Sequence, residues 1–134
     1  MVSITSERQV PLAENVTPNE VTVTASDGAQ TDLAISPAIS GTQRLLVHAI
    51  YASVGNATSV NVPVRVGFAE SALPARSLAG TAGILISHTD VSPGLGLYGI
   101  PGLGAPGAEL RLTCGETTGG NLSIVYLYEI INVT

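Results

Sequence analysis

Short apolar stretches with a two-residue repeat recur from residue 20 to residue 133, and they constrain the fold more than any other feature of the sequence. The clearest stretch spans residues 59–68, where Asn61 and Arg65 separate apolar side chains. Its inward set is expected to be Val60, Val62, Val64, Val66 and Phe68. Because side chains alternate between the two faces of a strand, this repeat predicts a strand with one buried face. No stretch of comparable length has a helical repeat, so an all-β fold is expected.

Further strand patterns fall in residues 20–25, 33–35, 43–53, 83–88, 109–114 and 121–133. Turn signals such as Ser26-Asp27-Gly28 and Gly119-Gly120 separate them. We therefore predict a single-domain β-sandwich or jelly-roll-like barrel of about 7–8 antiparallel strands over residues 20–134. Residues 1–19 contain two prolines and no sustained repeat, which favours an extended N-terminal arm.

Two of the predicted strands, residues 43–53 and 121–133, are apolar at odd and even positions alike. Each sheet of a sandwich has one inner face, so the second apolar face needs cover from the arm, a loop or another subunit. Subunit contact is the simplest of these answers. Pro63 cannot donate a hydrogen bond to a neighbouring strand, so its strand is expected at a sheet edge or next to a bulge.

The charge composition favours buried contacts and argues against polyanionic partners. Only 11% of residues are charged, against about a quarter in an ordinary soluble domain. Lysine is absent and the five cations are all arginine, the residue that interfaces retain while they exclude lysine. Compositional drift in a genome that favours arginine codons is the alternative explanation. A net charge of -5 argues against nucleic acid or an anionic membrane as a partner.

The first twenty residues lack the basic and apolar regions of a secretory signal, and no apolar run is long enough to cross a membrane. We therefore expect a soluble chain made in a cytoplasm.

Residues 92–107 form a Pro/Gly segment, SPGLGLYGIPGLGAPG, in which the pattern GxGxxG occurs twice. A dinucleotide site needs these glycines ahead of a helix, and the three prolines of the segment prevent that helix. The apolar side chains fit either a flap over the protein's own sheet or a tip inserted into a partner. The candidate partner-binding residues are Leu95, Leu97, Tyr98, Ile100 and Leu103 in this segment, and Tyr126 and Tyr128 in the last strand.

A metal site or a Cys/His pair would have to be built from His48, His88, Asp90 and Cys114, and their spacing fits neither. The ten acidic residues are scattered, and no serine lies in a nucleophile elbow. We therefore predict a protein that is not an enzyme and has no catalytic, cofactor or metal site.

The C-terminal part of the chain combines four features: the apolar strand that ends in His88, the Pro/Gly segment, the string Gly-Ala-Glu-Leu-Arg-Leu from Gly107, and Thr118-Gly-Gly before the tyrosine-rich last strand. In these features the chain resembles small virion proteins of tailed bacteriophages. The resemblance implies a capsid decoration or cement protein, a compact β domain that binds the outside of a phage head and clamps capsid subunits. The implied partner is the major capsid protein or another virion protein, and the implied location is the virion.

Two other functions fit the same sequence. A neck, tail or fibre component would share the composition and differ in copy number. A carbohydrate-binding β-sandwich would need exposed aromatic platforms, for which Tyr51 and Tyr98 are the plausible residues. For the assembly functions we expect a symmetric homo-oligomer, a trimer ahead of a dimer, because the apolar strand faces need cover.

Overall fold

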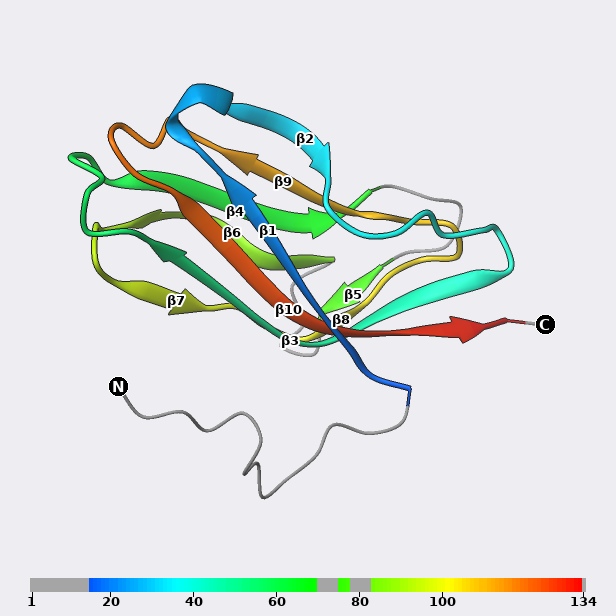
Figure 1. Ribbon diagram of the computed structural model, residues 1–134. Helices are drawn as coiled ribbons and strands as arrows, with labels where there is room; N and C mark the ends of the chain where they lie inside the picture. The colour runs from blue at the N-terminus through cyan, green and yellow to red at the C-terminus, as the bar shows by residue number, and fades with distance from the viewer. Residues whose placement is uncertain (1–14, 70–74, 78–82, 134) are drawn as a thin grey trace, which may run out of the picture.

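The computed structural model describes residues 15–69, 75–77 and 83–133, which fold into two antiparallel β-sheets packed face to face (Figure 1). Sheet A has the strand order β1-β10-β3-β8-β5, and β7 also pairs with β3. Its strands are β1 (Thr17–Val23), β3 (Gln43–Val54), β5 (Arg76–Ser77), β7 (Gly96–Tyr98), β8 (Gly102–Leu103) and β10 (Leu122–Asn132). Sheet B has the order β2-β9-β4-β6, formed by β2 (Gln30–Ala34), β4 (Val62–Phe68), β6 (Ile84–Val91) and β9 (Leu110–Cys114).

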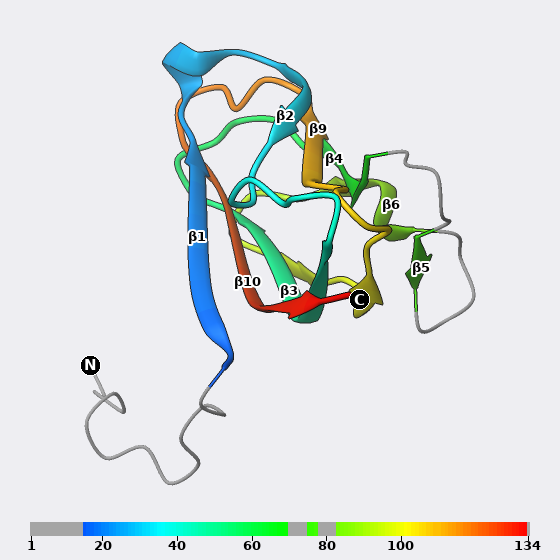
Figure 2. The same ribbon diagram turned by 90° about the vertical axis from the view of Figure 1, so that its right-hand side faces the viewer.

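The predicted all-β sandwich is confirmed, with more strands than expected. The described residues contain ten strands where the sequence predicts about 7–8. The additional strands β5, β7 and β8 lie in segments expected to be loops, and each is only two or three residues long. The short 3-10 helix η1 (Ala25–Asp27) carries the chain from β1 to β2 (Figure 2), where the sequence predicts a turn.

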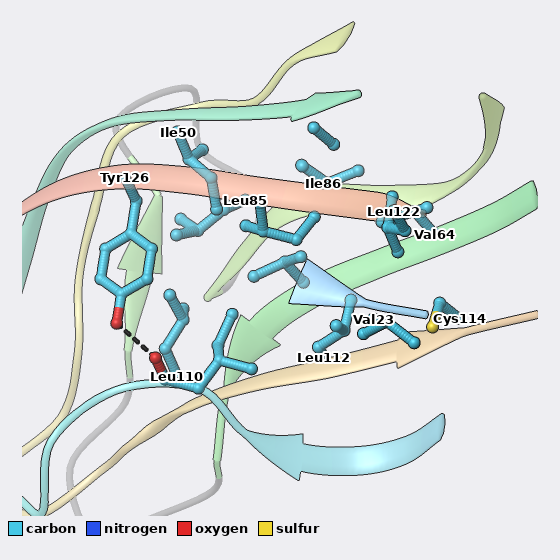
Figure 3. Packing of buried hydrophobic residues seen from close by; sticks show 14 of the residues in the cluster. Val23, Ile50, Val64, Leu85, Ile86, Leu110, Leu112, Cys114, Leu122 and Tyr126 are labelled. Atoms are coloured by element: carbon cyan, nitrogen blue, oxygen red, sulfur yellow. Dashed lines mark hydrogen bonds between the residues drawn. The ribbon is translucent and has the colours of Figure 1, made fainter. Parts of the chain in front are cut away.

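The core lies between the sheets and is made of aliphatic side chains from both (Figure 3). Leu45, Ile50 and Ile124 of sheet A share one buried cluster with Val64 and Leu112 of sheet B, and none of the five is more than 2% exposed. Full burial of such a side chain stabilises the fold by about 1.5–3 kcal/mol. The apolar residues at every second position of the predicted strands are therefore the ones that face the core.

Strand β4 differs from its prediction at its start. Val62, Val64 and Val66 are fully buried, as expected, but Val60 is 43% exposed because the strand begins only at Val62. Of the two alternatives predicted from Pro63, the edge position is wrong, since β9 and β6 flank the strand on both sides. The other alternative, a bulged strand, agrees with the irregular register of its pairing with β6 between Val64 and Gly67.

Pro63 is accommodated where the pairing with β9 ends. Strand β9 stops at Cys114, and the next residue, Gly115, donates its amide to the Pro63 carbonyl at 3.0 Å. A Cβ atom at Gly115 would lie 2.8 Å from Cδ of Pro63. The glycine therefore leaves room for the proline ring. The hydrogen bond that Pro63 cannot donate would be at the end of the β4–β9 pairing, where its loss interrupts no further pairing.

Strand β3 is apolar on both faces in the sequence because its inward phase changes halfway. Leu45 and Val47 are buried in its first half, Ile50, Ala52 and Val54 in its second, and His48 and Ala49 between them are exposed. The register with β10 shifts at this point, so that Leu127 pairs with Ala49 and Tyr128 with Val47. His48 is the extra residue of a β-bulge. The apolar residues at odd and even positions therefore come from this bulge and not from two continuous apolar faces along the whole strand.

Strand β1 begins within the segment predicted to be an extended arm. Thr17, Pro18 and Asn19 pair with Tyr128, Leu127 and Tyr126 of β10. The sheet therefore starts at least three residues before the predicted domain begins at residue 20, and residues 1–14 of the predicted arm lie outside the described residues.

Tyr126 is a core residue, and its predicted role as a partner contact is wrong. Its side chain is 1% exposed, and its hydroxyl donates to the carbonyl oxygen of Ile35 (Figure 3). The same hydroxyl accepts a hydrogen bond from Nδ2 of Asn19 at 2.8 Å. Burial is the main cause that raises the pKa of Tyr126 above its usual value. Tyr126 thus links β1, β10 and the segment after β2.

The substitution Tyr126→Phe should lower the free energy of unfolding by about 1–2 kcal/mol, because Asn19 and Ile35 lose a buried hydrogen-bond partner. Urea denaturation measures this loss. The matched control is Tyr128→Phe, since the half-buried Tyr128 has no hydroxyl hydrogen bond within the described residues, and its change should stay within about 0.5 kcal/mol. Equal losses in both variants would contradict the role of the Tyr126 hydroxyl.

The raised pKa of Tyr126 adds a second readout. The folded protein holds the phenolic proton to higher pH than the unfolded chain, so stability should fall as the pH rises above about 10. This alkaline loss should be smaller in Tyr126→Phe than in Tyr128→Phe.

Candidate contact surface

The Pro/Gly segment folds back along β3 and widens sheet A. Strands β7 and β8 run antiparallel to β3, with Leu97 opposite Ala52 and Gly102 opposite Val47. Backbone hydrogen bonds continue this contact outside the two strands. The donor and acceptor pairs are Gly94 N and Val54 O, Gly99 N and Ile50 O, and Gly104 N and Leu45 O, at 2.7, 2.9 and 2.8 Å. The segment therefore packs against the protein's own sheet as an extension of its edge beside β3.

The repeated glycines of this segment allow close packing against the core. A Cβ atom at Gly102 would lie 2.5 Å from Cδ2 of Leu85 and 2.8 Å from the carbonyl oxygen of Arg76. At Gly99 it would lie 2.5 Å from Cγ2 of Ile50. The glycine pattern therefore has a packing cause and needs no nucleotide to explain it.

Five of the seven candidate partner-binding residues are packed against the protein itself. Leu97 and Tyr128 are half-buried against the core cluster, and Tyr126 is buried within it. Ile100 is half-buried, and its amide donates to the Leu85 carbonyl at 2.8 Å, which ties the flap to sheet B. Leu103 is half-buried in β8.

The other two candidates, Leu95 and Tyr98, are exposed. Leu95 is 62% exposed in the turn before β7, and Tyr98 is 80% exposed in β7 itself. Tyr98 also contacts a residue of β3, since its ring centroid lies 4.6 Å from that of Tyr51 with the ring planes tilted by 51°. The structure therefore brings together the two tyrosines that the sequence singled out as possible platforms.

The position of the Tyr51 ring depends on Gly96. A Cβ atom at residue 96 would lie 1.8 Å from the hydroxyl oxygen of Tyr51 and 2.2 Å from its Cζ. The Tyr51 side chain therefore lies directly across the backbone of β7, beside the Tyr98 ring. This arrangement makes a ledge of two aromatic rings on the outside of the sandwich.

The ledge continues into an uncharged surface across three strands. Residues that face each other in an antiparallel pair lie on the same side of the sheet, and Tyr51 faces both Tyr98 of β7 and Val125 of β10. Leu127 faces Ala49 in the next row on that side. We call this surface the tyrosine face and define it as Ala49, Tyr51, Tyr98, Val125 and Leu127.

Polar residues border the tyrosine face. Ser53 and Ser123 face each other at one end, and Glu20 of β1 faces Val125 at the side. At the other end, Nε2 of His48 lies 3.1 Å from Oε1 of Glu129 in a largely exposed pair, which adds little to stability. An uncharged centre with a polar rim has the organisation of a protein interface.

Tyr51, Val125 and Leu127 were not among the candidate partner-binding residues. The sequence predicts outer apolar faces for both long strands, but the outward set of β3 depends on the bulge at His48. A local signal for that bulge would be the adjacent pair His48-Ala49, where the run loses its large apolar side chains.

The described residues contain no group of three or more His, Cys, Asp and Glu side chains that could hold a metal ion. Cys114 is buried, and this burial raises the pKa of its thiol, which disfavours the reactive thiolate. No helix in the described ranges is long and apolar enough to span a membrane.

No protein-family model and no curated protein matches this sequence. Among solved structures, the chain is similar to one from a study titled "Bacillus endospore appendages form a novel family of disulfide-linked pili". The two share 17% identity over 94% of this chain and 99% of the other, with a TM-score of 0.26. A likeness at that level carries no argument about function.

The substitution Gly96→Ala should displace the Tyr51 ring and break its contact with Tyr98. We expect changed ring-proton shifts of Tyr98 in NMR spectra and a loss of about 1 kcal/mol in the free energy of unfolding. The matched control is Gly41→Ala, where a Cβ atom meets nothing within 4 Å; its Tyr98 signals should be unchanged. A Gly96→Ala spectrum with the wild-type Tyr98 signals would contradict the described ledge.

Proposed function

We propose that the protein is a structural subunit of a tailed-phage particle, of the capsid decoration or cement type. It binds the outside of the assembled head, with the major capsid protein or another virion protein as its partner. It is made in the host cytoplasm and ends in the virion. The observation that carries this proposal is the tyrosine face, an uncharged surface on the outside of sheet A, where Tyr98 is exposed and Tyr51, Val125 and Leu127 are half-buried.

The tyrosine ledge has the properties of an interface anchor. A tyrosine ring buries about 150–250 Å² when it is covered, and Tyr98 is 80% exposed in the single chain. The contact with Tyr51 already orders this ring, so binding costs less side-chain entropy. Tyrosine is among the residues that dominate measured binding energies.

The composition supports the same function. A chain without lysine and with only 11% charged residues has little surface charge to desolvate when it is packed against a partner. The resemblance of the C-terminal segment to small phage virion proteins agrees with this. We also propose a symmetric homo-oligomer, a trimer ahead of a dimer, because copies of the chain can cover the apolar surface that a capsid leaves free.

The substitution Tyr98→Ala should weaken binding to heads that lack the protein by about tenfold, since it removes about 1.4 kcal/mol of contact. The Tyr98 side chain is 80% exposed, so the melting temperature should be nearly unchanged. The control is Val60→Ser, which alters an exposed apolar side chain outside the tyrosine face and should bind as wild type. Light scattering of the same variants reports whether self-association also depends on this face.

Cryo-EM of the parent particle tests the location. Density for the protein on the head shell is the expected result, and its absence from the shell would end the decoration proposal. A neck, tail or fibre component is the alternative within the same class. Quantitative mass spectrometry of purified particles separates the two, because a decoration protein that covers the whole head is present in many more copies than a component of the neck or the fibres.

Carbohydrate binding is a second candidate function, and the Tyr51–Tyr98 ledge favours it. Sugar rings stack on exposed aromatic side chains, and the hydroxyls of Ser53 and Ser123 lie on the same side of sheet A. A glycan array on which the wild type binds and Tyr98→Ala does not would favour this function. An array without binding would leave the assembly function as the proposal.

A further inference from the structure

A hollow of about 440 Å³ lies on the outer side of sheet B, which is the side of the sandwich away from sheet A. Arg65 of β4 and Arg111 of β9 line it, together with Asp32, Phe68 and Ile84. Two of the five cationic side chains of an acidic chain therefore line one depression. This surface is separate from the tyrosine face, and its chemistry does not depend on the proposed assembly function.

The pairing of β4 with β9 brings the two arginines together. Arg65 faces Thr113, and Gly67 faces Arg111, so both arginines lie on the same side of the sheet in neighbouring rows. Diagonal neighbours of this kind are about 7–8 Å apart at their Cα atoms. Gly67 has no side chain to fill the position opposite Arg111. A Cβ atom at Gly67 would lie 3.1 Å from the carbonyl oxygen of Gly83, so the backbone just before β6 forms one side of the hollow.

Both guanidinium groups keep unused donors. Arg111 donates from Nη1 to the carbonyl oxygen of Asp32 at 3.0 Å, and its Nη2 lies 3.9 Å from Oε1 of Glu109. Its Nε is buried and has no acceptor, which is a costly state for a charged donor. Arg65 has neither a hydrogen bond nor an ion pair within the described part of the chain. An acceptor oxygen in the hollow would accept hydrogen bonds from the Arg65 guanidinium and from the remaining Nη groups of Arg111.

We infer that this hollow is a binding site for a carboxylate group, held between Arg65 and Arg111. The planar fork of a guanidinium matches the two oxygens of a carboxylate or a phosphate. Asp32 at the hollow and Glu109 beside Arg111 offset the two positive charges, so a singly charged carboxylate is favoured over a doubly charged phosphate. Ile84, which faces Gly67 in the pairing of β4 with β6, adds an apolar residue to the lining, which suits a carboxylate carried on an aliphatic group.

Two sources could supply such a group, namely a free aliphatic carboxylate or an acidic side chain of a partner protein. The test is an NMR titration of the whole labelled protein, following the Nε–H signals of Arg65 and Arg111. The probes are butyrate, for the free acid, and the capped peptide acetyl-Leu-Glu-Leu-amide, for a side chain. We expect saturable shifts of both signals, with a dissociation constant for butyrate of about 1–10 mM, as its size allows.

Arg65→Gln should weaken the binding of either probe by about tenfold, since it removes one charge-assisted contact. This variant leaves the fold intact, because Arg65 is exposed and makes no bond to lose. The control Arg44→Gln removes the same charge from sheet A and should bind both probes as wild type, with folding checked by thermal melting.

Saturable butyrate binding without peptide binding supports the site and identifies a free acid as its ligand. Tighter binding of the peptide supports the site and identifies a protein side chain. The inference is overturned if neither probe gives a saturable shift, if Arg65→Gln binds as wild type, or if sulfate binds as tightly as butyrate.

Discussion

The pairing of β3 with β10 is the interaction on which the rest of the molecule depends. It runs from Val54 opposite Leu122 to Gln43 opposite Asn132, and it joins the two longest strands of the fold. Every other part of sheet A adds to this pair, with β1 on the far side of β10 and the Pro/Gly flap on the far side of β3. Tyr51, Val125 and Leu127 of the tyrosine face stand on these two strands, and Tyr98 stands on β7 beside them.

Much of the fold follows from local pattern, and the errors have a common cause. The alternation of Val62, Val64 and Val66 identifies a one-sided strand without any tertiary information. A two-residue repeat assigns side chains to the correct face only in a strand without insertions. The extra residue His48 therefore makes β3 look apolar on both faces in the sequence. The two- and three-residue strands β5, β7 and β8 are too short to show a repeat at all. The pairing of β7 and β8 is decided by β3, which lies far away in the sequence.

The candidate surfaces were only partly predictable because they depend on strand pairing, which a local sequence pattern does not contain. Tyr98 and Tyr126 both stand in apolar surroundings in the sequence, yet one is 80% exposed and the other 1%. The difference comes from which side of the sheet each ring takes. Alternation predicts that Arg65 and Arg111 both point outward, and both line the hollow. Their convergence depends on the register of β4 with β9, which no local pattern contains. Charge and hydropathy thus indicate what a surface is made of, while strand pairing decides which residues share it.

The bulge in β3 has a consequence for how this strand tolerates change in length. His48 is an inserted residue between two halves of β3 in which side chains alternate regularly. Because of this insertion, both halves keep their apolar side chains on the core side of the sheet. Removing that residue alone would leave Leu127 and Tyr128 of β10 opposite consecutive residues, in an unbroken ladder with the same inside and outside. Removing a residue in the middle of either regular half would turn the rest of that half over and expose buried side chains such as Leu45 or Val54. His48 is therefore the residue of β3 whose deletion leaves the packing of the sandwich unchanged. Any role of His48 has to lie on the outer surface, where it stands beside Glu129.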